Sequence, residues 1–285
     1  MRVSAIRGEP SAGSQNPSSE SVELSEIPTW SRGEPTAVPE LSSEPPPGRR
    51  VLILAAHADD ETFGCGGALA LHARRGDDLL LAVLTRGDRG DPEGLYRDTD
   101  YVELRRDEAR AAAADLGIQD VRFFDYPDQM GTEGRHLLPD LARDVQGLVD
   151  EFGPDLVYHP WAGEAHPDHW ILALATEDVA RKTSPEVLFV GYEIWSVFLP
   201  DLVVDVGPVY DRKEAAMSRY ESQLRYYDYV PICHALDTYR TLFWPTARYC
   251  EAFVRRRGGS ISPAEPGKVG LLQALFRRPG SRRKD

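Results

Sequence analysis

The sequence predicts an α/β protein with a three-layer, Rossmann-like domain and a mostly parallel central sheet. Short apolar runs, the first at residues 51–54, alternate with segments whose apolar residues recur at the helical period. The runs are far enough apart for crossover helices, which parallel strands require. Polar clusters directly follow two of the runs, at the sheet edge where ligands of such folds bind.

The individual elements follow from the apolar pattern and from the glycines that interrupt it. A first strand is expected at residues 51–56, a helix at 66–75 and a second strand at 79–84. An alanine-rich helix at 103–116 should end at Gly117, because glycine readily adopts the left-handed conformation that closes a helix. The remaining elements are expected to be a strand at 121–124, a helix at 140–152, a strand at 156–158, a helix at 169–182 and strands at 187–192 and 202–206.

The folded domain is predicted to span residues 50–257, between two tails. Residues 1–49 are rich in Pro, Ser and Glu, which predicts a disordered extension. Residues 258–285 form a basic tail that we expect to be flexible. Within this tail, the short apolar piece at residues 269–276 is expected to form a solvated helical turn, and the alternative is a helix that docks on a membrane surface or a partner.

The composition favours a soluble protein of a reducing compartment. Its net charge of −13 argues against nucleic acid as the principal substrate, since phosphate binding needs a concentrated basic surface. No apolar stretch approaches the ~20 residues of a membrane-spanning helix, and no secretory signal is recognisable, so we expect a cytoplasmic protein. A homo-oligomer and a weak contact of the basic tail with an anionic surface are compatible with the sequence.

Two polar clusters mark a candidate site. Residues 57–61 (His-Ala-Asp-Asp-Glu) follow the first strand, and residues 166–169 (His-Pro-Asp-His) lie beyond the strand at 156–158. His166 and His169 are three residues apart, so one helical turn would point both into a common cavity. The alternative for the first cluster is a polar turn in which Asp59 or Asp60 caps the next helix.

The side chains of the clusters are those that bind a divalent metal. The three cysteines do not form a Cys-x-x-Cys motif, so a metal must be held by imidazoles and carboxylates. Two imidazoles and one carboxylate suit Zn²⁺ with an open position for water. Fe²⁺ and other divalent ions accept similar donors, which leaves an iron(II) oxygenase as an alternative. Asp168 is expected to hold an imidazole in one tautomer.

The glycines at residues 64–67 join the first strand to the first helix, as in nucleotide-binding loops. Leu69 stands where a dinucleotide fingerprint would need glycine or alanine, and no Gly-Lys-Ser/Thr phosphate loop is present. The glycines therefore favour close packing of the helix on the sheet.

Residues 57–61 and 166–169 together resemble the paired motif of the PIG-L/LmbE-like deacetylases, the N-acetylglucosaminyl de-N-acetylases. The resemblance covers roughly residues 50–254, and Ala58 departs from it because the family usually has proline there. Alanine costs some local rigidity and removes no catalytic atom. Further matching positions are Thr85, Arg86, Gly87, Asp88, Arg105, Glu108, Tyr126, Pro127, Asp128, Lys213, Ser222, Gln223, Glu251, Ala252 and Phe253.

The resemblance implies a role for each residue of the paired motif. It implies that the ligands of Zn²⁺ are His57, Asp60 and His169. Asp59 would be the base that takes a proton from the attacking water. His166, next to Asp168, would face the developing oxyanion and the leaving amine, with Asp59 or His166 protonating that amine.

Substrate contacts are also implied by the resemblance. Those proposed for sugar hydroxyls or a neighbouring anionic group are Arg86, Arg105 and Asp128. The alternative for Arg105 is an exposed ion pair with Glu108. The aromatic side chains at 226, 227 and 229, with Trp195, would either stack on a sugar or belong to the core.

The resulting prediction is a zinc-dependent de-N-acetylase that acts on an N-acetylglucosamine-type conjugate, a small-molecule amino-sugar substrate. Two alternatives from other classes remain. One is a metal-containing carbohydrate-binding protein without turnover, and the other is the iron(II) oxygenase.

Overall fold

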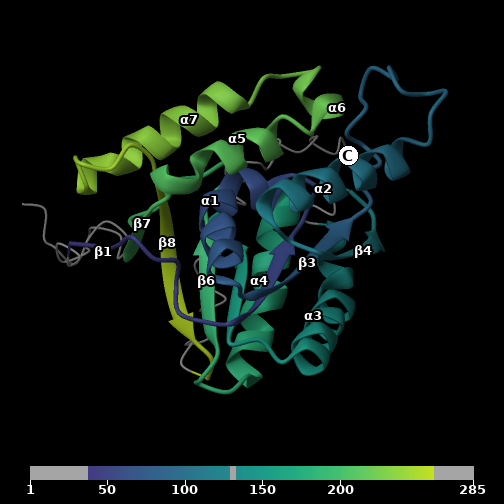
Figure 1. The fold of residues 1–285 in the computed structure, drawn as a ribbon. Coiled ribbons are helices and arrows are strands. Elements are labelled where there is room, and N and C mark those ends of the chain that lie inside the picture. Colours follow the sequence, from purple (N-terminus) through teal and green to yellow (C-terminus); the bar gives the residue numbers. More distant parts are fainter. Residues whose placement is uncertain (1–37, 129–132, 260–285) are drawn as a thin grey trace, which may run out of the picture. The chain divides into compact units, whose positions relative to one another are not determined.

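A computed structural model describes residues 38–128 and 133–259 of the chain. Within them, eight strands form one sheet in the order β1-β7-β8-β6-β5-β2-β3-β4 (Figure 1). Neighbouring strands are parallel except around β8, which runs antiparallel to β6 and β7. The strands are β1 (Glu40–Ser42), β2 (Arg50–Ala55), β3 (Asp78–Thr85), β4 (Asp120–Tyr126), β5 (Leu156–Pro160), β6 (Leu188–Tyr192), β7 (Leu202–Asp205) and β8 (Cys250–Arg257).

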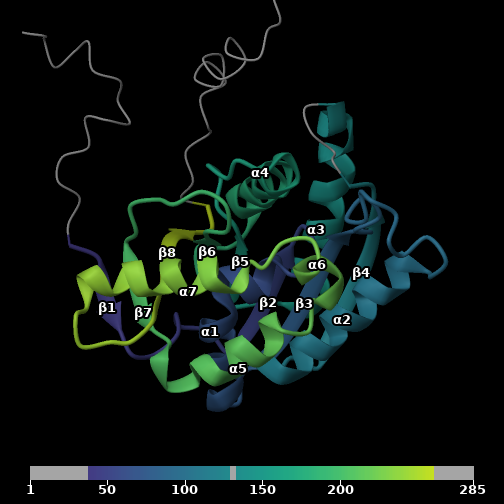
Figure 2. The same ribbon diagram turned by 90° about the horizontal axis from the view of Figure 1, so that it is seen from above.

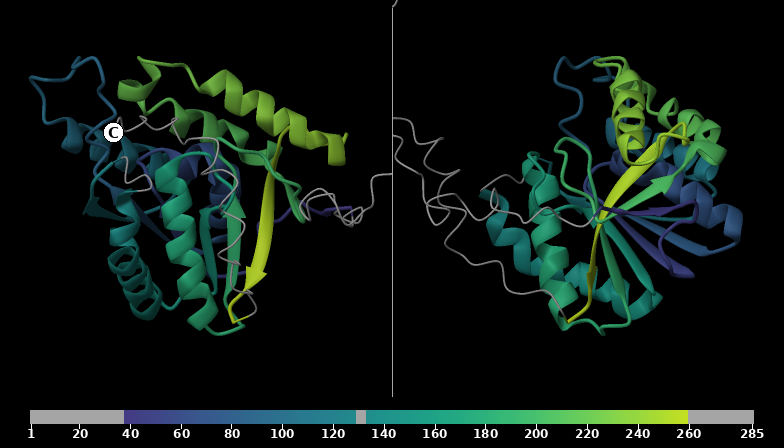
Figure 3. Two further views of the ribbon diagram at one scale, coloured as in Figure 1. Left: turned by 180° about the vertical axis from the view of Figure 1, so that it is seen from behind. Right: turned by 90° about the vertical axis from the view of Figure 1, so that its left-hand side faces the viewer.

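Helices cover both faces of the sheet, which confirms the predicted three-layer α/β architecture (Figure 3). In β2, Val51 and Ile53 pack with α1, α2 and α5, whereas Leu52 and Leu54 pack with α3 and α4 on the other face. No helix of the described part is both long and apolar enough to cross a membrane. The helices are α1 (Asp60–Arg75), α2 (Tyr101–Leu116), α3 (Leu138–Phe152), α4 (Pro167–Lys182), α5 (Tyr210–Met217), α6 (Glu221–Leu224) and α7 (Val230–Tyr239), with short 3₁₀ helices η1 (Glu133–Leu137), η2 (Gly207–Val209) and η3 (Arg240–Phe243).

Each element predicted between residues 51 and 206 is present, with shifted ends. The strand β8 and the helices α5 to α7 were not predicted. β8 ends in three arginines at residues 255–257, and such a basic run does not resemble a buried strand. In the structure these arginines nevertheless pair in register with β6. The helices α6 and α7 are short and lie at the end of the sheet to which the parallel strands point (Figures 1 and 2).

The prediction that residues 1–49 are disordered is wrong for β1. Glu40–Ser42 pairs in parallel with β7 at the edge of the sheet, and the Glu40 carboxylate accepts a hydrogen bond from Arg255 at 2.7 Å. A strand of three residues is too short to show an alternating pattern, and the nearby prolines resemble those of a linker. The tail segments at residues 1–37 and 260–285 lie outside the described residues.

The glycines after β2 let α1 pack closely on the sheet, as predicted. A Cβ atom at Gly64 would lie 2.3 Å from the Tyr192 ring, and one at Gly67 would lie 2.5 Å from Val206 Cβ. The predicted start of this helix at residue 66 is wrong, because α1 already begins at Asp60 and is kinked at Cys65, where φ is −147°. The polar first turn and the kink explain why the sequence suggested a loop there.

The order of the strands reverses at β2, whose neighbours are β3 on one side and β5 on the other. The helix α1 leaves β2 toward one face of the sheet, and α4 leaves β5 toward the other face. The loops that follow the two strands therefore diverge. Such a switch point leaves a crevice at the carboxyl ends of the strands, where ligands of open α/β sheets bind.

Candidate metal centre and active site

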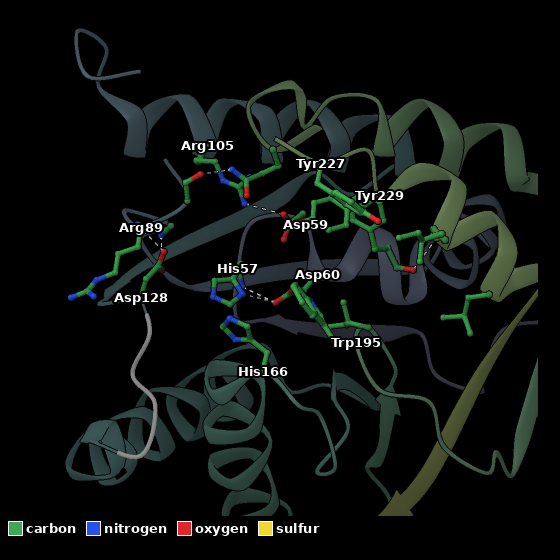
Figure 4. Close-up of a pocket in the computed structure, with 18 residues that line it drawn as sticks. His57, Asp59, Asp60, Arg89, Arg105, Asp128, His166, Trp195, Tyr227 and Tyr229 are labelled. Carbon is green, nitrogen blue, oxygen red and sulfur yellow. Dashed lines mark hydrogen bonds and ion pairs between the residues drawn. The ribbon is translucent and has the colours of Figure 1, made fainter. Parts of the chain in front are cut away.

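The two polar clusters predicted from the sequence meet at this crevice. His57 lies in the turn after β2 and Asp60 begins α1, while His166 precedes α4 and His169 lies in its first turn (Figure 4). The ring centroids of the three histidines are 4.7–5.3 Å apart. One helical turn thus brings His166 and His169 together, as their spacing predicted.

The side chains of His57, Asp60 and His169 contact one another. His57 Nδ1 lies 3.3 Å from His169 Nε2 and 3.5 Å from Asp60 Oδ2, and His169 Nε2 lies 3.1 Å from Asp60 Oδ1. Tetrahedral Zn²⁺ with bonds of about 2.0–2.2 Å separates its ligand atoms by about 3.3 Å. The three separations are close to this spacing, with Asp60 reaching His57 through Oδ2 and His169 through Oδ1.

The outer nitrogens of the two imidazoles each contact a carboxylate. His57 Nε2 lies 3.1 Å from Asp168 Oδ2, and His169 Nδ1 lies 3.3 Å from Glu164 Oε2. An N–H that donates to a carboxylate leaves the other ring nitrogen as a lone-pair donor facing inward, which is the usual arrangement around metal-binding histidines. Donation to these carboxylates would therefore give both predicted histidine ligands the tautomer that metal binding needs.

The charges around these groups favour a cation. Burial opposes charge on His57 and His169, yet Asp60 and the hydrogen-bonded carboxylates raise the pKa of His57 well above its usual value and that of His169 to about 9. Burial also opposes charge on Asp60, but His169 and His57 hold its pKa well below the usual range. The site thus stabilises positive charge at its centre. Zn²⁺ or Fe²⁺ would supply that charge, and both ions accept two imidazoles and a carboxylate as donors.

His166 and Asp128 lie close to the same centre. Two sets of donor atoms are mutually within 4.8 Å: those of His57, His166 and His169, and those of His57, Asp128 and Asp168. His166 Nδ1 accepts a hydrogen bond from the Asp168 backbone N–H at 3.3 Å, which places its own proton on Nε2. The expectation that Asp168 orients an imidazole holds for His57, not for His166.

Asp59 lies beside the centre without joining the contacts among the predicted ligands. Its Oδ2 accepts a hydrogen bond from Arg105 Nη2 at 3.1 Å, and its side chain is 20% exposed to the cavity. Although Asp59 is the residue before α1, its side chain makes no capping hydrogen bond, which excludes it as a simple helix cap. The alternative of an exposed Arg105–Glu108 pair is also wrong, because Arg105 is buried and the Glu108 carboxylate accepts from Ser222 N and Oγ.

Asp128 shapes the turn that follows β3. Its carboxylate accepts hydrogen bonds from Gly87 N at 3.0 Å and Arg89 N at 3.1 Å. Gly87 has a φ of +68°, a left-handed conformation that glycine adopts without strain, and the turn leads Arg89 into the cavity wall. Arg86, which the sequence suggested as a substrate contact, does not line the cavity and pairs with Asp88 at 3.2 Å.

A cavity of about 640 Å³ opens over the centre between two walls of different chemistry. We call the first the polar wall; it consists of Arg89, Arg105, Asp128 and Gln223. We call the second the apolar wall; it consists of Phe63, Ile194, Trp195, Tyr227, Tyr229, Ile232, Cys233 and Leu236. Figure 4 shows Arg89 and Asp128 on one side of His57, with Tyr229 and Trp195 on the other.

Part of the predicted aromatic cluster lies in the apolar wall. Trp195, Tyr227 and Tyr229 line the cavity, whereas the Tyr226 hydroxyl donates to Asp91 away from it. The sequence analysis did not identify Glu164, although it holds His169 and also accepts from the backbone N–H groups of residues 194–196. Its only sequence signal was its position five residues before a predicted ligand.

The comparisons with known proteins agree with this fold. The profile of the GlcNAc-PI de-N-acetylase (PIG-L) family matches residues 52–180. The 4-oxalmesaconate hydratase of Pseudomonas putida is 30% identical over 226 residues, which cover 71% of this chain and 86% of the hydratase. The profile match extends from β2 into α4 and includes both polar clusters.

Two deacetylases are also similar. The 1D-myo-inositol 2-acetamido-2-deoxy-alpha-D-glucopyranoside deacetylase of Kineococcus radiotolerans is 30% identical over 190 residues, which cover 54% of this chain and only 53% of that enzyme. The N,N'-diacetylchitobiose deacetylase structure from Pyrococcus horikoshii has a TM-score of 0.64 and 21% identity, covers 76% of this chain and 88% of that chain, and shares the fold. With its family profile, its relatives and its fold in agreement, the chain belongs to the PIG-L (GlcNAc-PI de-N-acetylase) family of LmbE-like proteins.

Proposed function

We propose that the protein is a metal-dependent amidohydrolase that removes the acyl group from an N-acylated amino-sugar conjugate. The observation that carries this proposal is the mutual contact of the His57, Asp60 and His169 side chains at 3.1–3.5 Å, with Asp59 beside them. The family supports the same chemistry, because its profile is named for a de-N-acetylase and one relative is a deacetylase of an acetamido sugar.

His57, Asp60 and His169 would hold Zn²⁺. The ion would supply a water molecule whose pKa is lowered toward about 7 and a positive charge beside the substrate carbonyl. Carboxylates on the outer nitrogens of both imidazoles keep the rings oriented for binding. Fe²⁺ fits the same donors, so the metal is part of the test.

Asp59 would act as the general base. Its carboxylate faces the cavity, and the hydrogen bond from Arg105 fixes its orientation. As the attacking water forms its bond to the amide carbon, Asp59 takes the proton. Asp59 can then pass that proton to the amine nitrogen as the C–N bond breaks.

His166 would stabilise the oxyanion. Because its Nδ1 accepts from the Asp168 backbone, its Nε2–H is the donor available to the cavity. A donor placed where negative charge develops is worth about 10²–10³-fold in rate.

The polar wall would bind the amino sugar. The Arg89 guanidinium carries several N–H donors for hydroxyl groups, and Gln223, whose Nε2 donates to Gly90 O and to the Tyr101 hydroxyl, offers its Oε1 as an acceptor. Each carboxylate oxygen of Asp128 accepts one backbone N–H and has a further lone pair for a sugar hydroxyl.

Hydration of an unsaturated carboxylate is a second candidate. It is favoured by the similarity to the hydratase and by the two arginines that line the cavity, since arginine binds carboxylates well. Against it, a small acid would leave Phe63, Ile194 and Leu236 without contacts. The two activities are separated by assaying free-amine release from N-acylglucosamines beside loss of the ultraviolet absorbance of an unsaturated dicarboxylate.

The hydrolase proposal is tested with metal analysis and amine release on the purified protein. We expect about one divalent ion per chain, loss of activity on chelation, and a fall in kcat of about 10²–10⁴-fold in Asp59→Asn. Asp125→Asn is the matched control, because Asp125 is an exposed residue paired with Arg106. Wild-type rates in Asp59→Asn, or activity unchanged by complete metal removal, would contradict the proposal.

A further inference from the structure

We propose that the acyl group removed by this protein is an extended alkanoyl chain and that the apolar wall binds it. The inference rests on the proposed function and names its substrate class. An acetyl group offers one methyl to the enzyme, whereas the apolar wall contains eight side chains from α1, from the loop after β6, and from α7 and the turn before it. The wall is far larger than a methyl group requires.

The side chains of the apolar wall form a continuous surface. Ile232 and Leu236 are four residues apart on α7, so they lie on the same helical face, with Cys233 beside them. Opposite α7, Ile194 and Trp195 are fixed because their backbone N–H groups donate to the Glu164 carboxylate. The surface is therefore preformed, which lowers the entropy cost of binding a flexible chain.

Exposure of the wall indicates that something apolar covers it. Trp195 is 63% exposed, Tyr227 54% and Ile232 52%, although all three line the cavity. Covering such side chains with hydrocarbon is favourable in proportion to the area removed from water. A sugar ring could stack on the aromatic rings, but Phe63, Ile194 and Leu236 offer no hydrogen-bond partners for hydroxyl groups.

The position of the metal ligands assigns the chain to the acyl side of the amide. Arg89 and Asp128 of the polar wall lie on one side of His57, and Trp195, Tyr227 and Tyr229 of the apolar wall lie on the other (Figure 4). A scissile carbonyl over His57 and Asp60 has its nitrogen substituent on one side and its acyl carbon on the other. If the hydroxyl groups of the amino sugar face Arg89 and Asp128, the acyl chain points toward the apolar wall.

The test is a series of N-acylglucosamines with acetyl, butanoyl, hexanoyl, octanoyl and decanoyl groups. We expect kcat/KM to rise about fourfold for each added methylene until the wall is covered, as hydrocarbon burial predicts. A second arm uses the octyl glycoside of N-acetylglucosamine, in which the hydrocarbon is attached to the sugar. A rise confined to that arm would assign the wall to an aglycone and overturn the proposal.

Two exposed residues provide matched variants. Ile232→Ser should lower the ratio of kcat/KM for decanoyl over acetyl substrate by about tenfold or more, because it places a hydroxyl in the wall. Leu242→Ser should leave the ratio unchanged, because Leu242 is a 69% exposed residue of η3 that does not line the cavity. Equal effects of the two substitutions would overturn the proposal.

Failure of the inference and failure of the proposed function give different results. If all chain lengths are hydrolysed at equal rates, the hydrolase stands and the chain-binding inference is overturned. If no amide is cleaved, the proposed hydrolase fails, and equilibrium dialysis of N-decanoylglucosamine against N-acetylglucosamine tests the wall by itself. Tighter binding of the decanoyl compound that Ile232→Ser abolishes supports the wall as a chain site, and equal binding overturns it.

Discussion

Two buried groups of charged side chains contact α1, and they differ in the source of their positive charge. In the first, Lys213 Nζ donates to Asp237 and to Glu251, each at 2.8 Å. Burial by itself would lower the pKa of Lys213, but the neighbouring carboxylates, Asp237 foremost, hold it well above its usual value. Glu251 also accepts from the backbone N–H groups of Gly67 and Ala68, so this cluster ties α5, α7 and β8 to α1.

In the second group, at the candidate metal centre, carboxylates face imidazoles. Asp60 accepts a hydrogen bond from the His57 backbone N–H and lies 3.1 Å from His169 Nε2, while Glu164 contacts His169 Nδ1 and accepts from the Ile194 backbone N–H. A divalent ion would supply here the charge that Lys213 supplies in the first group. The comparison separates two roles of buried carboxylates. Where a lysine of the chain supplies the opposite charge, they stabilise the fold; where that charge must come from an ion outside the chain, they indicate a functional site.

One substitution in each group should separate stability from activity, and this is the largest effect we expect. Lys213→Met leaves Asp237 and Glu251 buried without their cation, which should lower the free energy of unfolding by about 3–5 kcal/mol. Asp60→Asn removes a ligand charge and should reduce both bound metal and hydrolysis to background. Urea denaturation measures the first effect, and metal content per folded molecule measures the second.

The two variants serve as controls for each other. Lys213→Met should retain its metal at temperatures where it is folded, because Lys213 lies outside the predicted ligand set. If it loses metal as completely as Asp60→Asn, or if Asp60→Asn remains active, the distinction between the two groups is wrong.

The fold and the position of the site could be predicted because they depend on local pattern. Buried parallel strands read as continuous apolar runs, and parallel strands place their carboxyl ends at one edge. Residues 57–61 and 166–169 had to meet there once their strands were neighbours. The spacing of His166 and His169 then gave their shared orientation.

The walls of the cavity could not be predicted, because they depend on tertiary contacts between distant segments. Arg89 reaches the cavity through a turn held by Asp128, 39 residues away in the chain. The helix α7 is anchored by Asp237, which accepts from Tyr210 and Lys213 of α5. No periodicity in the sequence reports such contacts.

A smaller effect is expected from Glu164, which connects the metal centre to the apolar wall. Glu164→Gln removes the charge that faces His169 Nδ1 but keeps a carbonyl oxygen for the N–H groups of Ile194 and Trp195. We expect metal affinity to fall about 10- to 100-fold, as for other partners of ligating histidines. Competition with a chromophoric chelator measures the affinity, and Glu186→Gln, at an exposed position, is the control. Unchanged affinity would show that Glu164 serves only the loop.

The smallest expected effect distinguishes two kinds of buried histidine. Carboxylates raise the pKa of His57 and His169, whereas burial lowers the pKa of His159, at the end of β5, to about 4 despite its hydrogen bond to Pro160 O. Because the folded pKa lies below the unfolded value of about 6.5, the stability that neutral His159 contributes is full above that value and declines as the pH falls from 6.5 toward 4.

His159→Phe removes this titration while keeping a ring of similar size at a site that packs against Phe189. In that pH window, the free energy of unfolding of the wild type should fall more steeply than that of the variant, by up to about 1.4 kcal/mol per pH unit. Urea denaturation at a series of pH values in the presence of chelator measures both slopes, and above pH 7 they should coincide. Parallel slopes throughout the window would mean that His159 takes up its proton in the folded protein as readily as in the unfolded chain, and burial without a carboxylate would then not be enough to keep a histidine neutral here.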